Sequence, residues 1–310
     1  MTLDSRHQGH AGSPPSSRVG AVPWRTVPLL AALFLGGCGP GDANGAGAQS
    51  EPAPTQAALT LPAAYALVWS DEFTVDGLPD TTKWAYDTDM NQQGWHNHEL
   101  QYYSRARAEN AQVRDGKLVI TARKEPLPLA ADWGGQRYTS ARLVTRGKSE
   151  WTYGYFEIRA RLPCGKGTWP AIWMLGSRGE WPAGGELDIL EQVGNQPTRL
   201  FSTVHTTAGS GGNGVGAAVQ MTDACTSFHT YQMLWTEQEI RFGIDGKTHL
   251  TYPNRGLGDK QWPFGAPQFL ILNIAIGGDL GGPVDDSIFP VQMEIDHVRV
   301  YQKAPGGSQP

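Results

Sequence analysis

Hydrophobic and polar residues alternate with a period of two along much of the chain. Residues 156–161 (FEIRAR) alternate strictly, as expected for a half-buried β-strand. Clusters of glycine, proline and asparagine separate similar runs, as is typical of turns. No amphipathic pattern extends beyond two or three helical turns. The further predicted strands are 117–122, 171–175, 201–205, 231–235, 239–244, 269–276 and 293–301.

These runs predict an all-β domain at residues 61–303, where the sequence contains no repeat and no second linker. A single domain of this size, built from many antiparallel strands, buries its apolar faces by packing two sheets together. We therefore expect a sandwich or jelly roll. The composition agrees, because 39 glycines and a charged fraction of 18% suit sheets joined by long loops.

The N-terminus is typical of an exported protein. Arg18 and Arg25 precede an apolar run at 27–35, which is too short to span a bilayer stably as a helix. The sequence LGGC, ending at Cys38, resembles a bacterial lipobox. We expect residues 1–38 to be a lipoprotein-type signal peptide, with Cys38 acylated and the protein held at the cell surface or in the periplasm. Ordinary secretion without lipid is the alternative.

Two further features follow from export. Residues 39–60 are rich in glycine, alanine and proline and predict a flexible linker, and residues 304–310 predict a disordered tail. With Cys38 acylated, Cys164 and Cys225 remain as an even pair in an oxidising compartment. They predict a disulfide, with two separate buried thiols as the alternative.

Charge and aromatic content narrow the choice of partner. The formal net charge is −5 and no dense lysine and arginine cluster occurs, which argues against nucleic acid. The 11 tryptophans suit a protein that stacks on the flat faces of sugar rings, although filling the core is the alternative for many of them. We expect a monomer that meets a membrane only through its lipid.

The segment ELDILEQ, residues 186–192, carries the candidate chemistry. In a regular strand, Glu186 and Asp188 would share one face and Glu191 would share the other with Leu187. One extra residue at 189–190, a β-bulge, would turn all three acids to the same face. Without a bulge one set of carboxylates is buried in the core, so we predict the bulge. A solvated strand face or a calcium cluster is the alternative.

The spacing of these acids suits a retaining glycosidase. With the bulge, Glu186 and Glu191 are about 13 Å apart between Cα atoms. Side chains that lean together on a concave sheet can narrow this gap to near the ~5–5.5 Å of retaining enzymes. One carboxylate must be ionised and the other protonated, and Asp188 between them can separate their pKa values.

The ELDILE run resembles the catalytic signature of glycoside hydrolase family 16 in its bulged form. The resemblance covers most of residues 65–302. The other matching motifs, in the order of the family, are WSDEF at 69–73, GWHNHELQYY at 94–103, GTWPAIWML at 167–175, NIAIGG at 273–278, and DDS at 285–287 through VY at 300–301.

The resemblance implies a β-jelly roll with a concave cleft and a retaining endo-hydrolase of laminarin-type β-1,3-glucan. It assigns Glu186 as the nucleophile, Glu191 as the acid/base and Asp188 as the assisting acid.

The same resemblance implies the sugar contacts. Trp169, Trp173 and Trp181 fall where aromatic residues line the subsites, and Asn97 and His205 fall where polar side chains contact sugar hydroxyls. Core packing is the alternative for each tryptophan, and a satisfied buried histidine is the alternative for His205.

The chain departs from the family pattern at a few positions. His96 and His98 stand where glycine and asparagine are frequent, and Leu280 stands where many laminarinases carry an aromatic residue. These departures affect subsite preference and leave the catalytic acids untouched.

A structural calcium ion is also implied by the resemblance. Glu72, the carbonyl oxygen of Gly116 and Asp296 match the family's ligand positions, and oxygen ligands from separate strands suit Ca²⁺. Salt bridges are the alternative for these carboxylates. We expect no cofactor in the chemical step.

Three rival functions are weighed against the glucanase. A zinc hydrolase is disfavoured, because no HExxH or comparable spacing accompanies His96 and His98. A non-catalytic sugar-binding module is disfavoured because Glu186 and Glu191 are both present. Mixed-linkage glucan and galactans such as agarose remain as substrates for the same mechanism. Few basic residues lie near the cleft motifs, which disfavours a sulfated sugar.

Overall fold

The computed structural model of the chain describes residues 57–304. The predicted signal peptide with its predicted acylation site, Cys38, and most of the predicted linker lie outside the described residues, as does the tail from residue 305. Among the described helices, none is both long and apolar enough to cross a membrane.

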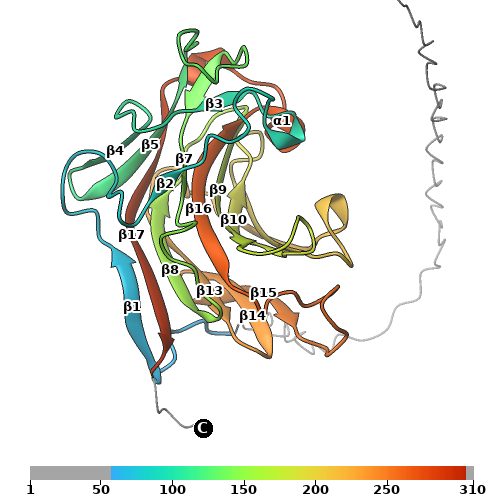
Figure 1. The fold of residues 1–310 in the computed structure, drawn as a ribbon. Helices are drawn as coiled ribbons and strands as arrows, with labels where there is room; N and C mark the ends of the chain where they lie inside the picture. The colour runs from blue at the N-terminus through green and yellow to red at the C-terminus, as the bar shows by residue number, and fades with distance from the viewer. Residues whose placement is uncertain (1–56, 305–310) are drawn as a thin grey trace, which may run out of the picture. The chain divides into compact units, whose positions relative to one another are not determined.

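The strands form one sheet of ten and one of seven (Figure 1). The order of the larger sheet is β15-β14-β13-β8-β17-β5-β6-β3, with β1 beside β17 and β4 beside β5. Its strands are β1 (Tyr65–Asp71), β3 (Gln101–Tyr103), β4 (Ala111–Arg114), β5 (Lys117–Lys124), β6 (Tyr138–Ser140), β8 (Gly154–Arg161), β13 (His229–Trp235), β14 (Glu239–Ile244), β15 (Lys247–Pro253) and β17 (Val291–Lys303).

The smaller sheet carries the predicted catalytic segment. Its order is β12-β11-β10-β9-β16-β7-β2. Its strands are β2 (Ala85–Tyr86), β7 (Arg142–Val144), β9 (Thr168–Gly176), β10 (Glu186–Gln192), β11 (Arg199–His205), β12 (Val215–Gln220) and β16 (Gln268–Ile276). Four short helical turns complete the described elements: η1 (His96–His98), η2 (Gly211–Asn213), α1 (Gly278–Gly281) and η3 (Asp286–Ile288).

The main core lies between the two sheets, because alternate residues of each strand turn inward. In β9, Ile172 and Met174 are fully buried in this core, whereas Trp173 turns to the opposite face. In β8, Phe156 and Ile158 are buried in the same core. The predicted all-β sandwich is therefore confirmed, and every pairing within it is antiparallel except that of β3 with β6.

The strand predictions are confirmed, most with longer bounds. The structure places β14 at Glu239–Ile244, as predicted, and extends β17 to Val291–Lys303. The pattern did not predict β1, the short strands β2, β3, β4, β6 and β7, or the longer strands β12 and β15. β12 is rich in glycine and alanine, and β15 contains an irregularity that breaks its alternation.

The domain begins earlier than predicted. Leu59 is 1% exposed and packs against Tyr155 and Leu234. Its backbone N–H donates to the carbonyl of Gly246 at 2.8 Å. Residues 57–60, predicted as the end of the linker, therefore belong to the folded domain, because an apolar side chain among them completes a small core cluster.

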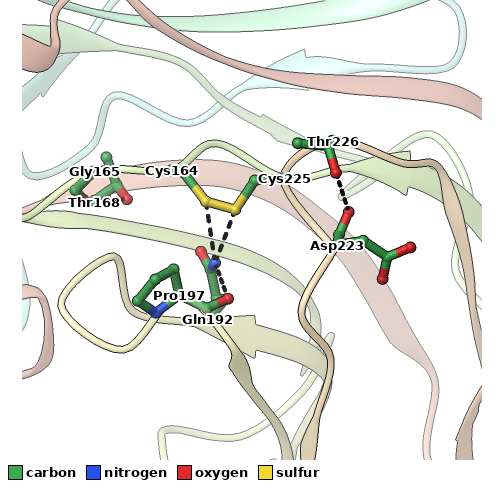
Figure 2. The surroundings of a disulfide bond; sticks show 8 residues. All are labelled: Cys164, Gly165, Thr168, Gln192, Pro197, Asp223, Cys225 and Thr226. Atoms are coloured by element: carbon green, nitrogen blue, oxygen red, sulfur yellow. Dashed lines mark hydrogen bonds between the residues drawn. A yellow bond between two sulfur atoms is a disulfide. The ribbon is translucent and has the colours of Figure 1, made fainter.

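Cys164 and Cys225 form a disulfide, with their Cα atoms 5.7 Å apart (Figure 2). The bond joins the segment after β8 to the segment before β13. The side-chain amide of Gln192, the last residue of β10, lies 3.9 Å and 3.7 Å from the two sulfur atoms and donates to the carbonyl of Pro197 at 2.9 Å. The disulfide thus contacts the end of the strand that carries the acids.

Candidate active site

The predicted bulge occurs in β10. Asp188 pairs with Thr203 of β11, but Glu191 pairs with Phe201, so two residues of β10 stand opposite one residue of β11. The register against β9 shifts at the same place, after Asp188. Ile189 is the extra residue, within the pair 189–190 where the sequence predicted the bulge.

The bulge decides which side chains face the core. Leu187, Ile189 and Leu190 are all buried in the core between the sheets. Because the two consecutive residues Ile189 and Leu190 both turn inward, Glu191 turns outward to the face of Glu186 and Asp188. The alternation that would have buried Glu191 in the core is broken at this single point.

The acids form a close cluster with one histidine. Glu186, Asp188 and His205 each offer a ligand atom, and these atoms lie within 4.8 Å of one another. The Nε2 atom of His205 is 3.1 Å from Oδ2 of Asp188. Asp188 is 2% exposed and Glu191 is 8% exposed. Several titratable groups therefore lie close together, and two of them have little surface exposed to solvent.

Burial raises the pKa values of two of the acids, Asp188 and Glu191. Burial, opposed by the hydrogen bond from the N–H of Trp169 and aided by the negative charges of Glu186 and Glu99, raises the pKa of Glu191 to about 7. Burial and the charges of Glu186 and Glu191 hold the pKa of Asp188 well above its ordinary value. The raised pKa of Asp188 favours its protonated form, and a Glu191 pKa of about 7 lets this residue both give and take a proton near neutral pH.

The three predicted tryptophans are placed differently. Trp169 is 8% exposed, and its indole N–H donates to Oε1 of Glu191 at 2.9 Å. Trp181 is 55% exposed, and its indole N–H donates to Glu186. Trp173 is half-buried and donates to Asn273 at 2.7 Å. Two of the three thus contact a predicted catalytic acid directly.

Of the two residues predicted to contact sugar hydroxyls, His205 lies in the acidic cluster and Asn97 does not. His205 lies in the cluster, and burial lowers its pKa, so its imidazole is neutral at pH 7. Asn97 lies outside it, in η1, with an exposed side chain and a positive φ of 57°. In the same turn, Nδ1 of His98 lies 2.8 Å from Oδ1 of Asp279 in α1. Leu280, also in α1, is 48% exposed.

Glu99 was not predicted as a site residue. Its carboxylate accepts a hydrogen bond from Gln101 at 2.8 Å, and burial raises its pKa. The positive charge of Arg142 lowers the pKa of Glu99 and so opposes burial. The guanidinium of Arg142 lies 4.7 Å from the centre of the Trp173 ring. The motif at 94–103 contains Glu99, but a sequence motif does not show that its charge acts on Glu191.

A pocket is lined by Trp181, whose indole contacts Glu186, and by Gly185, the residue before Glu186. Its lining includes Arg146, Leu175, Gly185 and Phe269 together with Trp181. The guanidinium of Arg146 lies 5.6 Å from the centre of the Phe269 ring. An apolar wall and one exposed indole suit the face of a sugar ring.

The carboxylates of the predicted calcium site already have cationic partners. Both oxygens of Glu72 accept from Arg299, at 2.9 Å and 2.8 Å. Oδ2 of Asp296 lies 3.0 Å from Nδ1 of His297 and 3.4 Å from Arg159. The side chains therefore fit the salt-bridge alternative better than a free set of oxygen ligands, and calcium stays a prediction.

Comparison with known proteins places the chain among glucanases. Residues 98–298 match the sequence model of glycosyl hydrolases family 16. A beta-glucanase of Rhodothermus marinus is 50% identical over 252 residues, which are 77% of this chain and 85% of that protein.

Solved structures agree. The X-ray structure of the laminarinase from Rhodothermus marinus has a TM-score of 0.73 at 50% identity and covers 77% of this chain and 98% of that one. A variant of a non-specific endo-β-1,3(4)-glucanase of the same family, co-crystallised with 1,3-β-D-cellotriosyl-glucose, has a TM-score of 0.78 at 48% identity, covering 81% and 100%. This likeness confirms the predicted β-jelly roll.

Proposed function

Because the chain belongs to glycosyl hydrolases family 16, we propose that it cuts laminarin-type β-1,3-glucan within the polymer, with retention of anomeric configuration. The observation that carries this proposal is the bulged strand, which turns Glu186 and Glu191 to one face and holds the pKa of Glu191 near 7. One acid can then attack while the other gives a proton.

The reaction follows from the two environments. Glu186 as carboxylate attacks the anomeric carbon, and the bond from this carbon to the leaving oxygen breaks. Glu191 gives its proton to that oxygen. Glu191, now ionised, takes a proton from water, and the hydroxide formed displaces Glu186 from the sugar. Two inversions at one carbon give retention.

Asp188 and the aromatic residues support this sequence of steps. A protonated Asp188 carries no charge that would repel the ionised Glu186 beside it. Trp181 exposes its ring and donates to Glu186, so a sugar stacked on this indole lies next to the attacking oxygen.

The substrate range is tested by three polymers side by side. We expect the purified protein to cut laminarin faster than mixed-linkage β-glucan and to leave agarose intact. Proton NMR during the reaction should show the β-anomer of the new reducing end first. An α-anomer as first product, or agarose as the best substrate, would contradict the proposal.

The role of Glu186 is tested by one substitution and one control. Glu186→Gln should lower the rate on laminarin by at least about 10⁴-fold, because the nucleophile is lost, while binding of oligosaccharide persists. Glu180→Gln, in the exposed loop before β10, is the matched control and should keep the rate. Persistent hydrolysis by Glu186→Gln would show that another residue attacks.

Export and attachment rest on sequence alone. We propose that the lipobox at Cys38 anchors the enzyme to a membrane, which would hold the cleft near polymeric glucan outside the cytoplasm. The described domain needs no metal in these chemical steps.

A further inference from the structure

The bulge in β10 leaves one backbone carbonyl that needs a partner inside the core. The carbonyl of Ile189, the extra residue, accepts a hydrogen bond from the hydroxyl of Ser202 at 2.7 Å. Ser202 is fully buried on the core face of β11, between Leu200 and Val204. It stands opposite the bulge, between the residues that pair with Asp188 and Glu191. Its hydroxyl is thus placed where regular strand pairing is interrupted.

A histidine from the other sheet completes the contact. Nε2 of His249 lies 2.9 Å from the Ser202 hydroxyl oxygen. Because the hydroxyl proton points to the carbonyl of Ile189, this oxygen must accept, and Nε2 of His249 must donate. Burial lowers the pKa of His249 to about 4, so the ring is neutral at pH 7 and carries its one proton on Nε2.

His249 is itself the extra residue of a second bulge. In the hairpin of β14 and β15, Phe242 pairs with Leu250, but the next residue, Gly243, pairs with Thr248. His249 stands between these partners and has none. A regular register would send adjacent residues to opposite faces, whereas this bulge allows His249 to reach across the core beside Leu250. The bulge in β10 and the bulge in β15 are therefore connected through the hydroxyl of Ser202.

We propose that Ser202 and His249 are positioning residues that lock the catalytic bulge, so that Glu191 stays turned toward the cleft. This inference rests on the proposed function of Glu191. Without the hydroxyl of Ser202, a buried carbonyl loses its donor, which favours a rearranged backbone at Ile189. A slip of one residue in this strand would move Glu191 to the opposite face. Neither residue touches the substrate.

Kinetics of Ser202→Ala test the proposal below the unfolding temperature. We expect kcat on laminarin to fall about tenfold or more, with KM within about twofold, because the acid is misplaced rather than the sugar. The basic limb of the rate profile should move to lower pH, since a less buried Glu191 ionises more easily. Ser202→Thr keeps a hydroxyl and should restore both values.

Two further variants sharpen the test. Ser140→Ala is the matched control, because Ser140 is fully buried in β6 and its hydroxyl has no hydrogen-bond partner in the described chain. It should keep kcat and the pH profile. His249→Phe should move both in the direction of Ser202→Ala, and the double variant should lose less than the product of the two single losses.

The outcomes separate the two proposals. Wild-type kcat and pH profile in both Ser202→Ala and His249→Phe, even with a lower Tm, would overturn the positioning role. If Ser202→Ala does not fold, His249→Phe decides by the same readout. An inactive wild-type protein would overturn the proposed function and this inference with it, whereas an active wild type with unchanged variants overturns only the inference.

Discussion

Trp169 and Trp173 stand four residues apart on one face of β9, yet their indole N–H groups donate to different partners. Trp169 donates to the carboxylate of Glu191, and Trp173 donates to the amide oxygen of Asn273. A donor to a carboxylate favours its ionised form, so Trp169 opposes the burial that raises the pKa of Glu191. The balance of these two effects keeps the acid usable near neutral pH.

Replacing Trp169 with phenylalanine should therefore shift the pH dependence. Trp169→Phe removes the donor and keeps a ring, so the pKa of Glu191 rises above about 7 and the basic limb of kcat/KM moves to higher pH. Trp173→Phe is the comparison, since its N–H does not reach Glu191, and its profile should keep the wild-type midpoint. A basic limb at the wild-type position in Trp169→Phe would contradict this account.

The placement of three acids on one face of β10 could be predicted from the sequence, but the source of their raised pKa values could not. The spacing of Glu186, Asp188 and Glu191 requires a bulge, because any regular strand buries a carboxylate in the core. Glu99, whose charge acts on Glu191, and His249, which contacts Ser202, both lie far from β10 in the sequence. Nothing in the local pattern around such a residue reports a contact made across the fold.

Among the elements, β10 is held at its far end by the disulfide. Gln192 closes this strand and its amide contacts both sulfur atoms (Figure 2). Cys164 and Cys225 are 61 residues apart, so their bond closes a long loop that includes β9, β10, β11 and β12. Closing a long loop restricts the unfolded chain more than the folded one.

Removing this bond should lower stability with little change in chemistry. The double variant Cys164→Ala with Cys225→Ala should lose about 2–4 kcal/mol of unfolding free energy and roughly 5–15 °C in Tm. Calorimetry with and without a thiol reductant measures this. The reductant should lower the Tm of the wild type and leave the variant unchanged, and an equal Tm in all four samples would argue against the bond.

Two of the longer strands that escaped prediction, β12 and β15, did so for identifiable physical reasons. β12 carries few large apolar residues, and as an edge strand it needs none on its outer face. β15 contains the bulge at His249, which breaks the period of two on which the prediction relied. β10 is bulged as well, but its acids made the irregularity necessary, whereas a histidine and threonines in β15 carried no such requirement.

At the scale of the whole molecule, the site costs stability. The folded pKa of Glu191 is about 7 against an ordinary 4.5, so the folded state binds the proton more tightly than the unfolded chain. Stability from this group is fully present below about pH 4.5 and is lost as pH rises through about 7. Above that pH the folded protein carries a buried charge.

Glu191→Gln should therefore give a more stable and nearly inactive protein. The amide is neutral at every pH, so the variant should gain on the order of 1–3 kcal/mol at pH 8 and nothing at pH 4. Thermal unfolding at the two pH values measures this difference. A gain of equal size at both pH values would point to packing instead of charge.

Leu59, near the start of the described residues, contacts the hairpin of β14 and β15 that contains His249. Leu59 bonds to Gly246 at the turn, and its side chain lies so close to Gly243 that a methyl group there would meet it at 2.7 Å. A gene product trimmed to start at residue 61 would keep every strand and every acid. It would lack the contacts of Leu59 with β14 and β15. Because His249 of β15 contacts Ser202 opposite the bulge, this loss in one sheet would disturb the position of Glu191 in the other.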